Sequence, residues 1–595
     1  MTEKMFSRHQ FPAAVSEVAD WLAASDYHKA GAVRAVHYGS RAEWWLDLSG
    51  LGYPIQAVKI SLNPEFPAAP CELFVDPKHC LALPHVEEDG RVCLATAPRP
   101  EDYVSPITAV AVALDQFSTQ LLHKSNSPLW IEREFHQERA SYWNRFNLQA
   151  LEARGARPPP RVTFVDVPAV DSWMEGSIAA YVRTSSKRQR IAVQVVTSKD
   201  HDPDALAKRH SWAEGTFMRG SSIFIRLPEA QLWTPATWPQ TFQEIVNLAH
   251  SATGGELSLE TWLRSAASAV HEGPAGNNKV ALGQQPLLVV FALGTELYGY
   301  QLSPPAVSIV ETLHVTPIII HRIDPQWIFA RDHATAVVNQ RLSKRVLLLG
   351  CGSLGCQVAE VLARSGVGKI DIVDMEIFDG PNISRHVLGM SAVRRGKAPS
   401  VAACITKEIP RIVVQGFAET AQRWVLEHCK PGKHDLVIDC TADSGVRQFL
   451  ALNRDRLLGD VPVAHAWVEP FCSATHVVAS MLDAPWPATD PVHPNVSAAT
   501  YPASTKVQLP ACSDGFHPYG SSDIMQAAGF CSERIISIID RPLEVSTVWS
   551  YVRSQAFFDG LGVPGIETNP IVPSQGAPND GISITRRLVD LLGKE

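Results

Sequence analysis

The residues best suited to chemistry lie between positions 346 and 439. The run VLLLGCGSLG places Gly350, Gly352 and Gly355 directly after an apolar, strand-like segment. Glycines at this spacing let the backbone approach phosphates at the N-terminus of the helix that follows. A second apolar segment, KIDIVD, ends at Asp374, where a carboxylate can accept hydrogen bonds from ribose hydroxyls. This pattern predicts a nucleotide site, and a dinucleotide is its commonest occupant.

Three charged residues further along the chain change that interpretation. Arg385 and Lys397 bring two cations toward a polyphosphate. Asp439 ends a later apolar segment, DLVID, where a carboxylate can hold Mg²⁺. A hydride-transfer enzyme has no need of these groups, whereas an enzyme in which a carboxylate attacks ATP uses all of them. We therefore expect Mg·ATP rather than a nicotinamide cofactor.

Together these residues resemble the adenylating domain of the enzymes that activate ubiquitin and sulfur carriers. Members of that family bind Mg·ATP and convert a partner protein's C-terminal carboxylate into an acyl-adenylate. The resemblance implies that Asp374 binds ribose and that Asp439 binds the metal. It also implies phosphate contacts from Asn382, Arg385 and Lys397. The chain lacks the C-x-x-C zinc clamp of the sulfur-carrier branch, because no two of its eleven cysteines have that spacing, and this favours the protein-conjugating branch.

A second candidate site lies in LALPHVEEDGRVCLATAPRPEDYVSP. Cys93 follows a D-G turn in an extended loop, which is an unusual place for a core thiol. The segment resembles the active site of ubiquitin-conjugating enzymes, in which H-P-N precedes a D-G-x-x-C-L turn and W-S-P follows. Residues 83–85 stand at H-P-N, residues 89–94 match the turn, and residues 104–106 stand at W-S-P. The resemblance implies that Cys93 is a covalent nucleophile; a buried structural cysteine is the alternative.

His85 stands where that family has its asparagine, whose side chain donates a hydrogen bond to the oxyanion as an amine attacks the thioester. An imidazole can donate from one nitrogen, so His85 is expected either to keep this role with an added pH dependence or only to order the turn. His79 is a weaker candidate for the same role.

The activating domain requires a thiol of its own. Cys472 and Cys531 lie in strand-like and helical apolar patterns and are expected in the core. Cys512 lies in a polar stretch, STKVQLPACSDGF, ahead of a helix expected to start near Ser521. Amides at a helix N-terminus favour a thiolate, and the resemblance implies a thiol in such a crossover loop. Cys512 is therefore the predicted second nucleophile, with a structural loop cysteine as the alternative.

One further residue follows from the resemblance alone. In this family an arginine ahead of the first strand commonly reaches the ATP of a neighbouring subunit. Arg331, in PQWIFARDHATAV, is the candidate, and a solvated helix arginine is the alternative. Cys351 and Cys356, inside the glycine turn, are expected to be small packing residues.

Composition limits the classes of protein to consider. The chain has 595 residues, of which 45% are hydrophobic and 19% charged, as in ordinary multidomain globular proteins. Its net charge of -8 gives no electrostatic footprint for nucleic acid, and its longest apolar runs are too short to cross a membrane. The N-terminus lacks the apolar core of a secretory signal, and the scattered cysteines suggest reduced thiols. A cytoplasmic enzyme is expected.

Three domains are expected to position these residues. Residues 1–155 read as helix, strands, loop and helices, the order of a ubiquitin-conjugating-like α+β domain. Residues 160–325 follow a proline-rich linker and alternate apolar segments as a mixed α+β domain does, with no catalytic motif. Residues 326–595 alternate strands with helices, which predicts a doubly wound, Rossmann-like parallel sheet.

This domain order resembles the bacterial fusion enzymes of CBASS, the cyclic-oligonucleotide antiphage signalling systems. In that family the CD-NTase-associated conjugating enzyme joins the C-terminus of a cGAS/DncV-like nucleotidyltransferase to a target, which primes the nucleotidyltransferase. The resemblance implies transfer of the acyl group from AMP to Cys512, then to Cys93, and finally to a target amine such as lysine. The distance between the thiols is expected to require a homodimer. Alternatives are conjugation of a ubiquitin-like protein, a sulfur-carrier adenylyltransferase, and a nucleotide-binding scaffold.

Overall fold

The computed structural model describes residues 10–24, 33–35, 41–66, 68–93, 105–152, 161–167, 170–184, 190–268, 285–303, 313–329, 335–487, 495–507 and 516–592. The chain divides into two compact units. The first comprises Met1–Val165, Ala169–Pro203 and Glu214–His321, and the second comprises Asp166–Pro168, Asp204–Ala213 and Arg322–Glu595. None of the helices in the described ranges is both long and apolar enough to span a bilayer.

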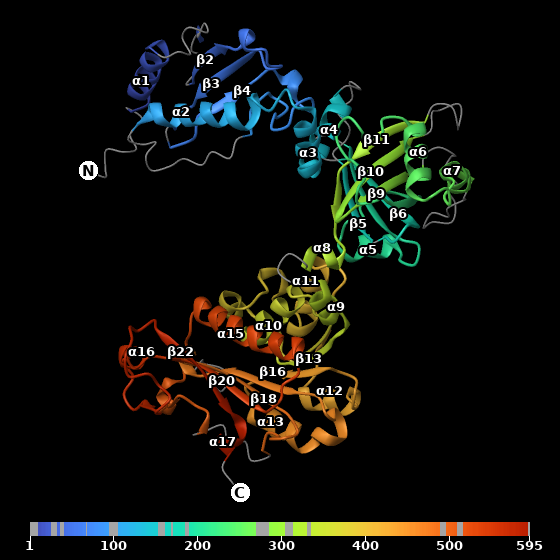
Figure 1. Cartoon of the computed structure of the whole chain (residues 1–595). Helices are drawn as coiled ribbons and strands as arrows, with labels where there is room; N and C mark the ends of the chain where they lie inside the picture. Colours follow the sequence, from blue (N-terminus) through green and yellow to red (C-terminus); the bar gives the residue numbers. More distant parts are fainter. Residues whose placement is uncertain are drawn as a thin grey trace. The chain divides into compact units, whose positions relative to one another are not determined.

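The N-terminal part of the first unit is an antiparallel meander with helices packed on it (Figure 1). Its elements are α1 (Gln10–Ala24), β1 (Val33–Ala35), β2 (Ala42–Asp47), β3 (Ala57–Leu62), β4 (Glu72–Phe74), α2 (Pro106–Phe117), α3 (Pro128–Gln137) and α4 (Arg139–Glu152). Burial alternates along β2, so that Trp44 and Leu46 face the core. Val18 of α1 and Leu114 of α2 belong to the same core. This is the helix–strands–loop–helix order that the sequence predicts.

The rest of the first unit is built on a mixed sheet in the strand order β11-β10-β9-β8-β6-β7-β5-β12. Its elements are β5 (Arg161–Asp166), β6 (Trp173–Thr184), β7 (Arg190–Ser198), α5 (Pro203–Arg209), β8 (Thr216–Arg226), α6 (Phe242–Ala252), α7 (Leu259–Ser268), β9 (Leu287–Leu293), β10 (Glu296–Ser303), β11 (His314–Ile318) and β12 (Ile320–Arg322). Helix α4 joins this core through Trp143, whose ring packs edge-on against Tyr298 and Tyr300. The Trp143 indole also donates to the Ile318 carbonyl, at 3.1 Å.

The second unit contains a doubly wound sheet in the order β15-β14-β13-β16-β17-β18-β20-β22. Its helices are α8 (Pro325–Phe329), α9 (Thr335–Ser343), α10 (Ser353–Arg364), α11 (Lys397–Glu408), α12 (Ala421–His428), α13 (Ser444–Asn453), α15 (Ser521–Asp540), α16 (Gln555–Gly560) and α17 (Leu588–Leu592). Its strands are β13 (Arg345–Leu349), β14 (Lys369–Val373), β15 (Val413–Phe417), β16 (Leu436–Asp439), β17 (Val463–Val468), β18 (Ala474–Ser480), β19 (Ala499–Thr500), β20 (Thr547–Arg553), β21 (Glu567–Thr568) and β22 (Gly581–Arg587).

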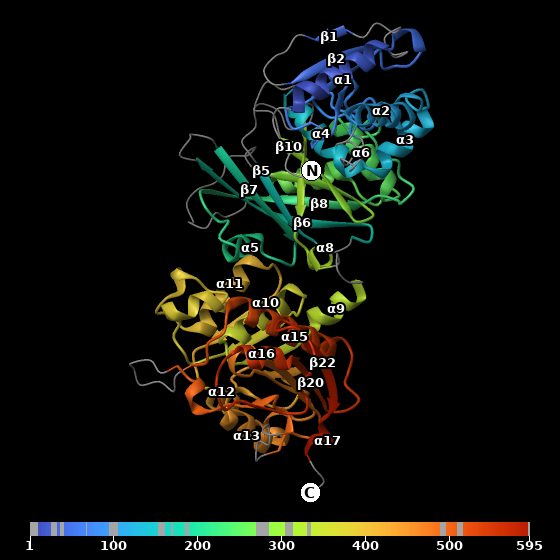
Figure 2. The same cartoon turned by 90° about the vertical axis from the view of Figure 1, so that its left-hand side faces the viewer.

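Five neighbouring strands of this sheet, β15, β14, β13, β16 and β17, run parallel to one another. Strands β18, β20 and β22 each run antiparallel to the strand before them in the sheet. Helices α10 and α15 lie side by side on one face, and α12 and α13 cover the other (Figure 1 and Figure 2). The connections change direction between β13 and β16, and ligands of such sheets bind beyond the carboxyl ends of the strands at that point. The predicted Rossmann-like class is confirmed.

Candidate active sites

In the glycine turn after β13, the first and last glycines are required because a side chain at either position would clash with the backbone. Gly350 has φ +86°, and a Cβ there would lie 2.8 Å from the backbone of Thr441. A Cβ on Gly355 would lie 2.0 Å from the Gly350 carbonyl oxygen. Gly352 differs, because a Cβ there would meet nothing within 4 Å. Gly350 and Gly355 therefore allow the chain to fold, while Gly352 keeps space open at the start of α10.

A pocket of about 230 Å³ lies beside this turn. It is lined by Gly352, Ser353, Glu376, Asn382, Arg385, His386, Lys397 and Tyr519. The structure thus brings together Gly352, Asn382, Arg385 and Lys397, each of which the sequence predicts as a ligand-binding residue. Of the other lining residues, Ser353 and His386 adjoin predicted residues, so sequence reasoning had a signal for them. Tyr519 had no such signal.

Lys397 is the first residue of α11 and is buried. Its ammonium pairs with the carboxylate of Glu376, whose side chain is 63% exposed. The Lys397 backbone N–H also donates to the Glu376 carbonyl, at 2.9 Å. Because the Glu376 carboxylate is exposed, it can move aside, and phosphate oxygens can take its place at the buried ammonium. Lys397 is therefore a fixed cation that faces a replaceable anion.

Asn382 and Arg385 lie in the short 3-10 helix Gly380–Arg385. The Asn382 side-chain oxygen accepts from the Asp379 backbone N–H at 3.1 Å, which leaves its amide NH₂ as the group suited to phosphate. The Arg385 guanidinium donates to the Pro381 carbonyl at 3.1 Å and lies 5.7 Å from the ring centre of Tyr519. A cation is thus held against an aromatic wall of the pocket.

Two side chains fix the glycine turn from the pocket side. Asp374 accepts from the backbone N–H groups of Cys351 (2.6 Å) and Glu376 (2.7 Å). Burial raises the pKa of Asp374, and these two hydrogen bonds oppose the rise. His386 Nδ1 accepts from the Leu388 backbone N–H, so Nε2 carries the proton that is donated to the Cys351 carbonyl, at 2.9 Å. Burial lowers the pKa of His386, consistent with a neutral ring.

Asp439 ends β16 and is almost fully buried, outside the set of described residues that line the pocket. One of its oxygens accepts from the Thr441 hydroxyl (2.6 Å), and the other lies 2.9 Å from His465 Nδ1. Burial acts to raise the pKa of Asp439, but the hydrogen bonds from His465 and Thr441 outweigh it and hold the pKa below its usual value. A single carboxylate suits Mg²⁺ in a nucleotide site, because the ion takes its other ligands from water and phosphate.

Cys93 is exposed and follows a short antiparallel pairing of Val86 with Val92. Its backbone N–H donates to the His85 carbonyl at 2.8 Å. His85 itself has φ +61°, an uncommon conformation for a residue with a side chain. The His85 backbone N–H donates to the hydroxyl of Tyr142, a fully buried residue of α4, at 2.8 Å. A continuous chain of hydrogen bonds therefore runs from α4 to the candidate nucleophile.

The His85 ring faces two carboxylates. Its Nε2 lies 3.4 Å from Glu134 of α3, and its Nδ1 lies 3.8 Å from Glu138. The Tyr142 hydroxyl donates to the same Glu138 carboxylate, at 3.1 Å. These contacts are those of a histidine that orders the turn, and the oxyanion role of His85 stays a prediction. His79 is buried.

Of the remaining predicted residues, some lie outside the described residues and the others are buried cysteines. Cys512 and Arg331 lie outside the described residues, as do residues 94–104 that follow Cys93. Cys472 and Cys531 are buried as predicted, and burial raises the pKa of Cys472 to about 12. Cys351 and Cys356 are also buried, and α15 begins at Ser521.

Two family matches agree with these sites. The sequence matches the ThiF family over residues 330–481 and prokaryotic E2 family B over residues 40–151. The first match contains the glycine turn, Asp374, Lys397 and Asp439, and the second contains His85 and Cys93. The domain types that the sequence predicts for these two parts of the chain are therefore confirmed.

Individual relatives match shorter stretches. The ATP-dependent ubiquitin transferase-like protein Cap2 of Enterobacter hormaechei subsp. hoffmannii (strain UCI 50) is 34% identical over 120 residues, 19% of each chain. The protein of the same name from Vibrio cholerae serotype O1 is 28% identical over 146 residues, 24% of this chain and 25% of that protein. The matched stretches thus span a quarter or less of these relatives. The structure of E. coli MccB with ATP covers 40% of this chain and 68% of that chain at 15% identity, with a TM-score of 0.28.

Proposed function

We propose that this chain, which joins a prokaryotic E2 family B domain to a ThiF domain, is an ATP-dependent protein ligase. It would activate the C-terminus of a partner protein and attach it to a target amine. The observation that supports this most is the pocket in which Asn382, Arg385 and Lys397 surround Gly352 at the carboxyl edge of the parallel strands. Donors and fixed cations at a helix N-terminus are what a polyphosphate requires.

The first step would be adenylation. The partner's terminal carboxylate attacks the α-phosphorus of ATP, pyrophosphate leaves, and an acyl-adenylate forms. Lys397 and Arg385 offset the negative charge that develops around the transferring phosphorus, and Asp374 orients the ribose. A Mg²⁺ ion held through Asp439, when bound, supplies charge neutralisation at the phosphates.

Two sulfur atoms would then carry the acyl group. The Cys512 thiolate attacks the acyl carbon and releases AMP, and Cys93 takes the group by exchange, which frees Cys512. A target amine attacks the Cys93 thioester to give an amide and a free thiol. The two thioesters have similar energies, so proximity governs the exchange. We propose a homodimer in which Arg331 reaches the ATP of the neighbouring subunit.

The partner we propose is the C-terminus of a cGAS/DncV-like nucleotidyltransferase, with a lysine or other amine as the final acceptor. The order of the domains supports this choice, and so does the similarity to two proteins named ATP-dependent ubiquitin transferase-like protein Cap2. A ubiquitin-like protein offers the same chemistry through its own C-terminal carboxylate. The two partners are distinguished by experiment.

The test uses the full chain with Mg·ATP and each candidate partner. ATP–pyrophosphate exchange that depends on one partner identifies it as the substrate of adenylation. Non-reducing gels then follow thiol-labile adducts in the wild type, in Cys93→Ala and in Cys512→Ala. We expect Cys93→Ala to leave exchange intact and to accumulate the adduct at Cys512, and Cys512→Ala to abolish both adducts. Cys404→Ala removes another exposed cysteine and serves as the control.

Partner-independent exchange, or an adduct that persists when both cysteines are replaced, would contradict the proposed relay. Conjugation to a ubiquitin-like protein but not to a nucleotidyltransferase would keep the chemistry and change the partner.

A further inference from the structure

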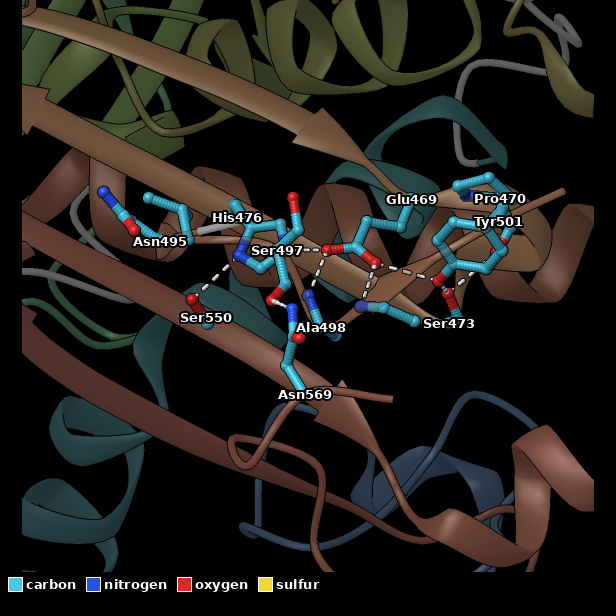
Figure 3. A network of polar contacts seen from close by, with 12 residues as sticks. Glu469, Pro470, Ser473, His476, Asn495, Ser497, Ala498, Tyr501, Ser550 and Asn569 are labelled. Atoms are coloured by element: carbon cyan, nitrogen blue, oxygen red, sulfur yellow. Dashed lines mark hydrogen bonds and ion pairs between the residues drawn. The ribbon is translucent and has the colours of Figure 1, made fainter. Parts of the chain in front are cut away.

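A buried polar centre, Glu469 with His476, lies in the same unit as the pocket and has no part in the chemistry above (Figure 3). Glu469 directly follows β17, and His476 lies on β18. The His476 Nε2 is 2.7 Å from Glu469 Oε1, and its Nδ1 is 2.8 Å from Ser550 Oγ on β20. Arg586 of β22 donates to the same Ser550 oxygen, at 3.0 Å. Hydrogen bonds therefore link Arg586, Ser550, His476 and Glu469 in series, and the Glu469 carboxylate is the acceptor at the end of the series.

Serine, histidine and glutamate are also the groups of a hydrolytic triad. That role does not fit, because Ser550 and His476 are fully buried and Glu469 is nearly so. A nucleophile without access to solvent has no substrate. The centre must instead act on the parts of the chain that it holds.

The segment held by Glu469 is 495–501, which lies between β18 and β20 in the chain (Figure 3). Besides His476, the carboxylate accepts from the backbone N–H groups of Ala498 (2.6 Å) and Ala499 (3.3 Å) and from the Tyr501 hydroxyl (2.8 Å). Burial acts to raise the pKa of Glu469, but these donors outweigh it and hold the pKa below its usual value. An ionised carboxylate thus accepts from the amides at the start of β19, a strand that pairs with β21 on its other side.

The carbonyl groups of the same segment are satisfied from other strands. Arg586 donates to the carbonyls of Asn495 (3.3 Å) and Val496 (3.2 Å). Asn569 donates to the Ser497 carbonyl through its side chain, at 2.8 Å. Side chains from the rest of the domain therefore fix both the donors and the acceptors of this backbone.

The fixed segment continues to the pocket. The ring of His517 lies 6.4 Å from the ring of Phe471, two residues after Glu469. Val507 and Phe516 pair through two backbone hydrogen bonds, of 2.8 and 3.1 Å. The stretch 516–519 is thereby joined to Val507, six residues after the last residue that Glu469 contacts.

The same stretch ends at Tyr519, which lines the pocket, and we call residues 516–519 the wall. The hydroxyl groups of Tyr519 and Ser353 lie 2.6 Å apart, which joins the wall to the first residue of α10. The Arg385 guanidinium lies 6.0 Å from the ring centre of Phe516 and 5.7 Å from that of Tyr519. A shift of the wall therefore moves both a helix N-terminus and a phosphate-binding cation.

We propose that Glu469, supported by His476, is a positioning residue for the nucleotide: it fixes segment 495–507 and, through it, the aromatic wall 516–519. This inference rests on the proposed function only in taking ATP as the ligand. Weakening the centre should raise the Kd for ATP and its KM in exchange three- to tenfold, with little change in the exchange rate at saturation.

The test compares Tyr501→Phe and Glu469→Gln with the wild-type chain by calorimetric titration of a non-hydrolysable ATP analogue and by thermal unfolding. Ser546→Ala is the matched control, because Ser546 is a buried anchor just before β20 whose hydroxyl donates to Asp483 and accepts from the Met481 backbone N–H, both at 2.7 Å. That variant should lower Tm without changing the Kd. Tyr501→Phe removes a single hydroxyl, so it keeps the test decisive if Glu469→Gln fails to fold.

Unchanged affinity in Tyr501→Phe, or an equal loss in Ser546→Ala, would overturn the positioning role while leaving the proposed function intact. A wild-type chain that binds no ATP analogue would overturn the proposed function, and this inference with it. A rise in the Kd for the ATP analogue in Tyr501→Phe, with no rise in Ser546→Ala, would support both the positioning role and the proposed function.

Discussion

The pocket around Lys397 and the loop around Cys93 differ in how exposed their candidate residues are. Lys397 is buried, and its ammonium pairs with Glu376. Asp374, beside the glycine turn, accepts hydrogen bonds from the backbone of Cys351 and Glu376. Cys93 is exposed, and its backbone N–H donates to His85, which Tyr142 of α4 holds. The proposed polyphosphate chemistry needs charges fixed in advance of the reaction, whereas the proposed acyl transfer to and from a thiol needs access.

The strongest test of the pocket side is Lys397→Ala. We expect ATP–pyrophosphate exchange to fall roughly 100- to 1,000-fold, because a fixed cation at the transferring phosphate is lost. Lys407→Ala, on the same helix with a side chain that is 54% exposed, should have no effect. Exchange in Lys397→Ala within twofold of wild type would contradict the role of this pocket.

Two glycine variants separate folding from binding within the turn. Gly355→Ala should lower the free energy of unfolding by about 1–3 kcal/mol, because its Cβ overlaps a carbonyl oxygen. Gly352→Ala should leave stability unchanged, since its Cβ meets open space, yet weaken ATP binding because that space belongs to the pocket. Urea unfolding and ATP titration of both variants provide the measurement. Equal losses of stability and of ATP affinity in the two variants would contradict this separation.

On the thiol side, Tyr142→Phe should leave the half-buried His85 N–H without its partner, at a cost of about 1 kcal/mol. Part of this cost should appear as a loosened turn, with discharge of the Cys93 thioester to an amine slowed severalfold. Exchange, which reports on the other domain, should not change. Single-turnover discharge assays check this, with the half-buried Tyr53→Phe as a control in the same domain.

The smallest expected effect is on acid stability. The pKa values of Asp439 and Glu469 are lowered in the folded chain, so the unfolded chain binds more protons between the folded and unfolded values. Their stabilising contribution is complete above the unfolded pKa values of about 4 and is lost as the pH falls through the folded ones. Each unit of lowering corresponds to about 1.4 kcal/mol. Urea unfolding between pH 6 and pH 3 should show a shallower decline for Glu469→Gln than for wild type.

The sequence by itself determined the local features of both sites. The glycine turn, the carboxylates after β14 and at the end of β16, and the D-G turn before Cys93 are short patterns whose geometry depends on neighbouring residues. The doubly wound class followed from alternating apolar strands and helices for the same reason. These features could be predicted from the sequence because the interactions that fix them span few residues.

Only the tertiary structure decided which distant groups meet. Tyr519 reaches Ser353, Tyr142 reaches the His85 backbone, and Glu469 holds segment 495–501 through hydrogen bonds that no periodicity records. Such partners come together because the sheet aligns the carboxyl ends of its strands and because buried polar groups must find donors or acceptors wherever the fold supplies them.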